Sequence, residues 1–363
     1  MLSKRYVLVS VLATICFLLF LLPPMYDSGT LNPQQLSSDP RENATFVTLA
    51  RNSDLDGIMG TIRGVEDRFN HRYNYDWVFL NNEEFSDEFI KMTSQIISGE
   101  AKYGVIPKEH WSYPDYIDKE KAAEGRKKME EDGIIYGGSE SYRHMCRYES
   151  GFFFQHPLMQ DYRYYWRVEP DTLLLCDINY DPFKYLRVNN KAYGFTIALY
   201  EYMATIPTLW EVTLKFLSSF PEYVHPHNLA KFLSEDGGQN YNRCHFWSNF
   251  EIADADFWRG DAYQNYFKFL DRMGGFFYER WGDAPVHSLA AALFLDRDQI
   301  HFFEDIGYYH PPYAHVPENF LERGLKCTFP EKRTFDWEGY SCMRHYYSAQ
   351  DMELPPQVDR IYW

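Results

Sequence analysis

Beyond its first forty residues, the chain alternates between the hydrophobic patterns of strands and helices. Thr45–Ala50 alternates polar and apolar side chains as a strand does, and residues 77–80 form a second apolar run of strand length. Between them, apolar side chains recur every three or four residues from Leu55 to Phe69, which predicts a helix, and a second helix is predicted from Ser86 onward. This order indicates a mostly parallel sheet covered by helices, whose ligands bind at the carboxyl ends of the strands.

The later patterns continue the same kind of domain. Residues 209–220 have the spacing of an amphipathic helix, and residues 300–303 form another apolar strand. Residues 119–132 are charged with few apolar positions, which predicts a solvated helix or connection on the surface. No repeat and no linker interrupts the core-like sequence. We therefore expect one α/β domain from residue 45 to residue 363.

The N-terminus carries the longest uncharged stretch of the chain. Two basic residues precede seventeen uncharged ones, residues 6–22, which end at two prolines. A cleaved signal peptide usually has a shorter apolar core and a small-residue cleavage site, although that alternative stays open. The pattern favours a cytosolic tail (1–5), a transmembrane signal anchor (6–22), a Pro/Ser/Asn/Gln-rich stem (23–44) and a lumenal domain (45–363).

The sequon and the cysteines beyond the anchor are compatible with a lumenal location of the domain. Asn43 opens an Asn-Ala-Thr sequon, which predicts a glycosylation site. Five cysteines lie beyond the anchor, and because none has C-x-x-C spacing, a zinc site is not expected. An odd number leaves at least one free thiol. Cys327 and Cys342 lie close together in a loop-like tail, and we predict a disulfide between them.

Composition narrows the possible partners. The formal net charge is −16, whereas a sequence-independent nucleic-acid binder needs a basic surface, so no nucleic-acid partner is expected. A hydrophobic content of 45% excludes a disordered chain. Aromatic side chains make up 18% of the residues. Their flat faces suit sugar rings, although they also fill cores.

Two carboxylates, Glu169 and Asp171, follow an apolar strand at residues 164–168. Strand alternation would direct both carboxylates to the same side, as a metal site requires. Carboxylate oxygens suit Mg²⁺ or Mn²⁺, which in turn neutralise a diphosphate. The same acid-x-acid pattern is common in turns without any metal.

Three further side chains have both a functional and a structural interpretation. Glu251 lies among aromatic and apolar neighbours, where a carboxylate is either a paired structural group or a functional one. His310 follows the strand at residues 300–303 in a predicted loop, where a histidine can bind a metal but usually does not. Arg51 follows the first strand, where a guanidinium can hold a phosphate or a base, or lie in a solvated turn.

These segments together resemble the fungal Golgi α-1,2-mannosyltransferases, glycosyltransferase family 15. The resemblance covers residues 45–330, and strings of nine or more residues such as Cys-His-Phe-Trp-Ser-Asn-Phe-Glu-Ile make it specific. The matching strings lie at residues 136–148, 166–171, 244–252, 276–287 and 304–312. The anchor, the stem and the acidic lumenal domain match the family as well.

The resemblance implies a retaining transfer of mannose from GDP-mannose to the 2-hydroxyl of an acceptor mannoside on glycoproteins, with Mn²⁺ as cofactor. It also implies a single-domain nucleotide-sugar (GT-A-like) fold with a mixed, mostly parallel sheet, in a type II protein of the Golgi membrane. By position, Glu169 and His310 match metal ligands. Glu251 matches the carboxylate proposed as nucleophile, and Asp283 lies in a motif near the reaction centre.

Three more positions match residues near the nucleotide: Arg51, Tyr142 and Arg167. Two other classes of protein stay open at this point. A lumenal mannan-binding protein without activity would explain the aromatic content equally well. A glycoside hydrolase could use a pair of carboxyl groups, here Glu169 and Glu251, without a nucleotide.

Overall fold

The computed structural model describes residues 41–356 and 358, which belong to one unit beginning at Pro40. The tail, the anchor and all but the end of the stem that the sequence predicts lie outside the described residues. Within the part of the chain that is described, no helix is long and apolar enough to cross a membrane. The boundaries of tail, anchor and stem therefore stay predictions.

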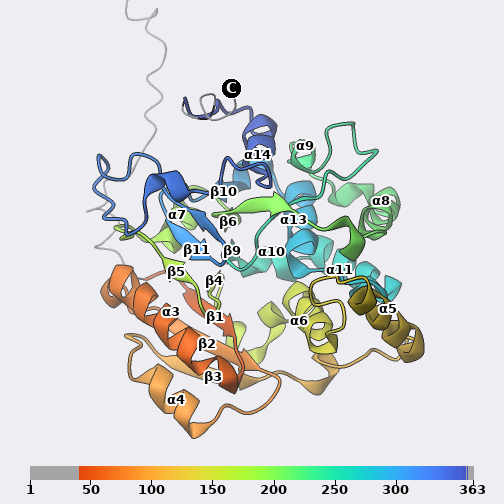
Figure 1. The fold of residues 1–363 in the computed structure, drawn as a ribbon, viewed down its shortest axis with the longest axis horizontal. Helices are drawn as coiled ribbons and strands as arrows, with labels where there is room; N and C mark the ends of the chain where they lie inside the picture. Colours follow the sequence, from red (N-terminus) through yellow and green to blue (C-terminus); the bar gives the residue numbers. More distant parts are fainter. Residues whose placement is uncertain (1–40, 357, 359–363) are drawn as a thin grey trace, which may run out of the picture. The chain divides into compact units, whose positions relative to one another are not determined.

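The central sheet has seven strands in the order β10-β6-β9-β4-β1-β2-β3, running from the top to the bottom of Figure 1. Its strands are β1 (Ala44–Leu49), β2 (Asp76–Asn81), β3 (Ala101–Val105), β4 (Tyr164–Arg167), β6 (Tyr193–Phe195), β9 (Glu251–Asp254) and β10 (Ile300–Phe302). Neighbours pair in parallel except at β9, which is antiparallel to both β4 and β6. The mixed, mostly parallel sheet implied by the resemblance is therefore present.

Side chains of β1 and β2 alternate between two cores because both faces of the sheet are covered. Phe46 and Trp77 pack with α3 and α7 on one face, whereas Val47 and Val78 belong to the core of α6, α11 and α13 on the other (Figure 1). The helices of the described chain are α3 (Leu55–Arg68), α4 (Asp87–Ser94), α5 (Lys119–Glu131), α6 (Glu140–Gly151), α7 (Pro182–Val188), α8 (Leu209–Ser219), α9 (Ala230–Leu233), α10 (Ala255–Arg259), α11 (Asp261–Met273), α12 (Gly275–Tyr278), α13 (Asp283–Phe294) and α14 (Met343–Ala349).

The local patterns are confirmed in these elements. On α3, Ile58, Ile62 and Val65 are buried, and α4 begins where the Ser86 hydroxyl accepts a hydrogen bond from the backbone N–H of Phe89 at 3.1 Å. The charged segment forms α5, which is solvated along most of its length. Helix α13 is different because it is buried along nearly its whole length, and its first residues reach the carboxyl end of the sheet.

Two small sheets complete the fold. One has the order β12-β11-β5 and the other pairs β7 with β8. Their strands are β5 (Leu173–Leu174), β7 (Ala198–Tyr200), β8 (Cys244–Phe246), β11 (Tyr308–His310) and β12 (Tyr313–His315). One disulfide includes Cys244 of β8, and the other includes Cys176, two residues after β5.

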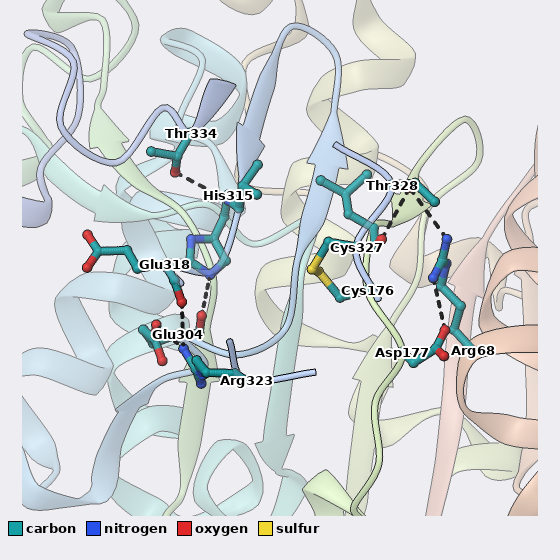
Figure 2. The surroundings of a disulfide bond; sticks show 12 residues. Arg68, Cys176, Asp177, Glu304, His315, Glu318, Arg323, Cys327, Thr328 and Thr334 are labelled. Carbon is teal, nitrogen blue, oxygen red and sulfur yellow. Dashed lines mark hydrogen bonds and ion pairs between the residues drawn. A yellow bond between two sulfur atoms is a disulfide. The ribbon is translucent and has the colours of Figure 1, made fainter. Parts of the chain in front are cut away.

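The predicted disulfide between Cys327 and Cys342 is wrong. Cys327 bonds to Cys176, and Cys342 bonds to Cys244. The backbone explains the pairing: the N–H of Thr328 donates to the carbonyl of Leu175 beside β5, whereas Cys342 donates to Ala198 in β7. Figure 2 shows the first disulfide beside the Arg68–Asp177 ion pair and Thr328. The remaining described cysteine, Cys146, is free and buried, as the odd count requires.

Candidate active site

The reversal of β9 assembles the centre of the site. Because β9 is antiparallel to β4, its first residue, Glu251, pairs with the last residue of β4, Arg167. Arg167 is only 7% exposed and is surrounded by carboxylates. Its Nη1 donates to Oδ2 of Asp283 at 2.6 Å, and its Nε donates to Oε1 of Glu169 at 3.0 Å. Glu149 of α6 lies 3.5 Å from the same Nη1.

The carboxyl groups of this cluster differ in their pKa values. Burial raises the pKa of Asp283, but the adjacent guanidinium of Arg167 outweighs it and leaves that pKa below its usual value. Burial, together with the charges of Asp283, Glu169 and Glu251, raises the pKa of Glu149 to about 8, so Glu149 carries a proton at neutral pH. Even so, the carboxylates outnumber the one guanidinium. The excess of negative charge suits a divalent cation.

Glu251 lies below this cluster and is 0% exposed. The hydroxyl of Tyr165 donates to its Oε1 at 2.6 Å, and Nδ1 of His287 lies 3.1 Å from its Oε2. Trp258 in turn donates to the Tyr165 hydroxyl at 2.8 Å. Both carboxylate oxygens are therefore held in place. Electrostatic stabilisation by Glu251 needs no change of this arrangement, whereas nucleophilic attack requires one of the two contacts to open.

The Glu169 turn departs from the alternation that the sequence predicted. The chain leaves β4 at Arg167, and Asp171 has a φ of 61°, in the left-handed region. Its carboxylate packs against α3, where a Cβ atom on Gly57 would lie 2.6 Å from Oδ1 of Asp171, so a larger residue there would displace this carboxylate. Asp171 is thus directed to α3, and Glu169 remains as the carboxylate of this turn beside Arg167.

The sequence predicts a loop at His310, and this prediction is wrong. His310 is the last residue of strand β11. The antiparallel register pairs Tyr309 with Leu173, and its continuation places His310 opposite Thr172, whose hydroxyl donates to the carbonyl of Glu169 at 2.9 Å. The small sheet therefore puts His310 one residue beyond the pairing with β5, the strand that follows the Glu169 turn. Its Nδ1 lies 3.0 Å from the carbonyl oxygen of Pro311, an arrangement in which Nδ1–H donates and Nε2 keeps its lone pair.

A carboxylate oxygen and an imidazole nitrogen fit Mn²⁺ when substrate phosphates supply further ligands. Among the residues that the structure describes, three other candidate ligands lie within 4.8 Å of one another, at His227, Asp296 and Asp298. Exposed groups of this kind are common without a metal, and this one does not adjoin the Arg167 cluster.

The remaining predicted residues lie at the edges of the cluster. Arg51 follows β1, its side chain is 70% exposed, and it pairs with Asp54 at 3.2 Å. Tyr142 is half-buried on α6, with the guanidinium of Arg280 5.2 Å from the centre of its ring. Asn43 is exposed directly before β1, and its glycosylation stays a prediction.

Three residues of the site were not predicted from the sequence. Arg280 lies in one of the strings that carried the resemblance and Glu149 directly follows another, but no local pattern marks them as buried beside Tyr142 and Arg167. His287 has a recognisable signal, because it follows Asp283 by four residues on one helix and so lies on the same helical face.

The comparisons with known proteins agree with this geometry. Residues 26–351 match the glycolipid 2-α-mannosyltransferase family. The chain belongs to this family. It is 59% identical over 317 residues to the α-1,2-mannosyltransferase KTR1 of Saccharomyces cerevisiae, covering 87% of this chain and 81% of that protein. It is 52% identical over 333 residues to the O-glycoside α-1,2-mannosyltransferase omh1 of Schizosaccharomyces pombe, covering 91% and 85%.

Solved structures of similar proteins have the same fold. Core-mannan synthase A of Aspergillus fumigatus, solved in its Mn/GDP form, is 39% identical with a TM-score of 0.82, covering 87% of each chain. The mannosyltransferase Ktr4p of S. cerevisiae in complex with GDP is 35% identical with a TM-score of 0.81, covering 99% of this chain and 100% of that one. The family resemblance found in the sequence is therefore confirmed.

Proposed function

We propose that this protein transfers mannose from GDP-mannose to the 2-hydroxyl of a mannoside acceptor on a glycoprotein, with retention at the anomeric carbon. The observation that carries the proposal is the cluster of Arg167, Glu169, Asp283 and Glu251 at the carboxyl end of the sheet, in a member of this family. The names of the relatives support the donor, the acceptor hydroxyl and the reaction.

Glu169 and His310 are the residues that would hold Mn²⁺. The ion, when bound, neutralises the charge that develops on the leaving diphosphate. The Mn/GDP form of the Aspergillus protein supports Mn²⁺ as the cofactor.

The chain's own groups supply the rest of the chemistry. Arg167 is fixed between Asp283 and Glu169, so its guanidinium needs no reorganisation when negative charge develops beside it. Arg51, which is exposed, and Tyr142, which is half-buried, are the residues that would contact the nucleotide. Glu251 stabilises positive charge at the anomeric carbon, either from its buried position or as a nucleophile after one of its contacts opens.

The proposed location is the Golgi membrane, as a single-pass type II protein with the catalytic domain in the lumen. The basic N-terminus and the uncharged stretch at residues 6–22 support the anchor. Two disulfides support an oxidising compartment.

The test is GDP release and mannose transfer with GDP-mannose, Mn²⁺ and methyl α-mannoside. An α-1,2-linked disaccharide formed with GDP, and lost on addition of EDTA, is the expected result. Glu169→Gln serves as the site control, because it removes a charged ligand and keeps the shape of the side chain. Sugar release without a nucleotide would indicate a hydrolase, and acceptor binding without turnover would indicate a mannan-binding protein.

A further inference from the structure

Four aromatic side chains from separate segments form a row beside the candidate active site. Trp247 lies between β8 and β9, Tyr313 begins β12, Tyr340 precedes α14, and Tyr202 follows β7. The ring centres are 5.7 Å apart from Trp247 to Tyr313, 6.3 Å from Tyr313 to Tyr340 and 6.1 Å from Tyr340 to Tyr202. We call these four residues the aromatic row.

One end of the aromatic row adjoins the reaction centre. The ring of Trp247 contacts the ring of His310, with centres 4.7 Å apart. The next residue, Ser248, donates a hydrogen bond to Oδ2 of Asp283 at 2.7 Å. Trp247 therefore contacts the predicted metal ligand, and its neighbour in sequence contacts the carboxylate that holds Arg167.

The other end also returns toward the site. Tyr202 directly follows Glu201, whose Oε1 lies 3.7 Å from Nη2 of Arg280. Arg280 in turn covers the ring of Tyr142. The aromatic row thus borders the site on the side of β7, β8 and β12. Arg51, which is predicted to contact the nucleotide, belongs to a different segment and follows β1.

The aromatic row is held rigidly by the backbone. The disulfide between Cys244 and Cys342 joins the segment of Trp247 to the segment of Tyr340. The carbonyl of Tyr340 also accepts a hydrogen bond from the N–H of Tyr200 at 3.3 Å. The ring of Tyr313 packs on that of buried Phe335, with ring centres 4.0 Å apart. A surface fixed in this way needs little ordering when a ligand binds.

The exposure of the aromatic row argues against a purely structural role. Tyr202 is 53% exposed, and the other three rings are only partly buried. Rings that only fill a core are covered, as Phe335 is. Amphipathic rings in a partly open row suit the flat faces of pyranose sugars, with hydroxyl groups at the edges of both partners.

We infer that the aromatic row binds the mannosyl residues of the acceptor that lie beyond the sugar receiving the new linkage. This inference rests on the proposed function. The reacting sugar lies at the Trp247 end, next to Asp283, and the following sugars stack on Tyr313, Tyr340 and Tyr202 in turn. The enzyme therefore prefers an acceptor oligosaccharide to a single mannoside.

The test compares two acceptors in the full-length enzyme, methyl α-mannoside and α-1,2-linked mannotriose. The measured quantity is the ratio of kcat/KM for mannotriose to kcat/KM for methyl α-mannoside. Tyr202→Ala and Tyr340→Ala each remove one stacking ring and should lower this ratio by roughly 2- to 10-fold. Tyr202→Phe keeps the ring and should preserve the ratio. Tyr116→Ala is the matched control, because Tyr116 is 50% exposed but contacts Asp271 of α11, away from the row.

Each outcome decides the inference. A ratio that falls for the alanine variants alone supports stacking by the aromatic row. A ratio unchanged in both Tyr202→Ala and Tyr340→Ala, in protein that melts as the wild type does, overturns it. An equal fall in the Tyr116→Ala variant also overturns it, because the effect would then be general. If the wild type transfers mannose to neither acceptor, the proposed function itself fails; transfer with an unaffected ratio removes only the aromatic row.

Discussion

Replacing Glu149 by glutamine should stabilise the protein, and increasingly so as the pH rises. Glu149 is fully buried on α6 and has a pKa of about 8, against a usual value of 4.5, because burial disfavours its charged form more than Arg167 favours it. A glutamine has nearly the shape of the protonated acid and cannot ionise. The variant therefore retains the form in which the folded protein already holds this group at neutral pH.

The magnitude follows from the two pKa values. Below pH 4.5 the carboxyl is protonated in both the folded and the unfolded chain, so its full contribution to stability is present there. As the pH rises toward 8, the unfolded chain ionises and the folded chain does not, which costs the wild type about 1.4 kcal/mol per pH unit. The total is on the order of 5 kcal/mol. The Glu149→Gln variant lacks this loss, so its advantage should grow from about 1 kcal/mol or less at pH 5 to several kcal/mol at pH 8.

The assay is urea unfolding of wild type and variant at pH 5, 6, 7 and 8, with EDTA present so that bound metal does not contribute. Asp271→Asn is the contrasting control. Asp271 forms a bidentate pair with Arg147 at 2.8 and 2.9 Å, so the same acid-to-amide change should destabilise, by about 3–5 kcal/mol. A difference between Glu149→Gln and wild type that does not change with pH would refute the reasoning, as would a loss of stability at pH 8.

Three further predictions concern single side chains. Glu251→Gln should lower turnover per folded molecule on the order of 10²-fold while the dissociation constant of GDP-mannose stays near the wild-type value; a normal rate in folded protein would remove Glu251 from the mechanism. His310→Ala should raise the Mn²⁺ concentration for half-maximal activity at least about 10-fold with little change in Tm, and an unchanged titration would exclude it as a ligand. Burial lowers the pKa of His315, but the carboxylate of Asp336 at 2.8 Å outweighs burial and raises this pKa above 6.5. The stability that His315 contributes is therefore fully present below pH 6.5 and is lost as the pH rises through the pKa of His315 in the folded protein. Urea unfolding of His315→Gln should therefore show a deficit that shrinks from pH 6 to pH 8, and a deficit that grows would contradict this sign.

The elements of the fold were predictable because their signals are local. The helical spacing of α3 and the alternation in β1 depend only on neighbours in the sequence, and both elements formed within a residue or two of the predicted bounds. The direction of β9 was not predictable in this way. A strand of four residues has the same pattern in either direction, and only its pairing with β4 makes Glu251 the neighbour of Arg167.

The errors in the sequence analysis have the same physical origin. Cys327 and Cys342 are close in sequence, but the segment between them leads from β5 to the β7–β8 sheet, so each bonds to a partner about a hundred residues or more away. Three residues of strand are too few to show alternation, so the pattern around His310 predicts a loop where the structure has the end of β11. Asp171 was placed beside Glu169 because a left-handed residue after proline breaks the alternation without any mark in the hydrophobic pattern.

The proton on Glu149 also bears on catalysis, because Glu149 lies beneath the one guanidinium of the cluster. Asp283 and Glu169 already outnumber the guanidinium of Arg167, so an ionised Glu149 would add a further negative charge to a site in which the leaving diphosphate also becomes more negative. Burial that holds Glu149 in its neutral form keeps the excess of negative charge small enough for a divalent cation to offset. The burial that lowers stability at high pH is thus the same feature that keeps the site suited to receive an anionic donor.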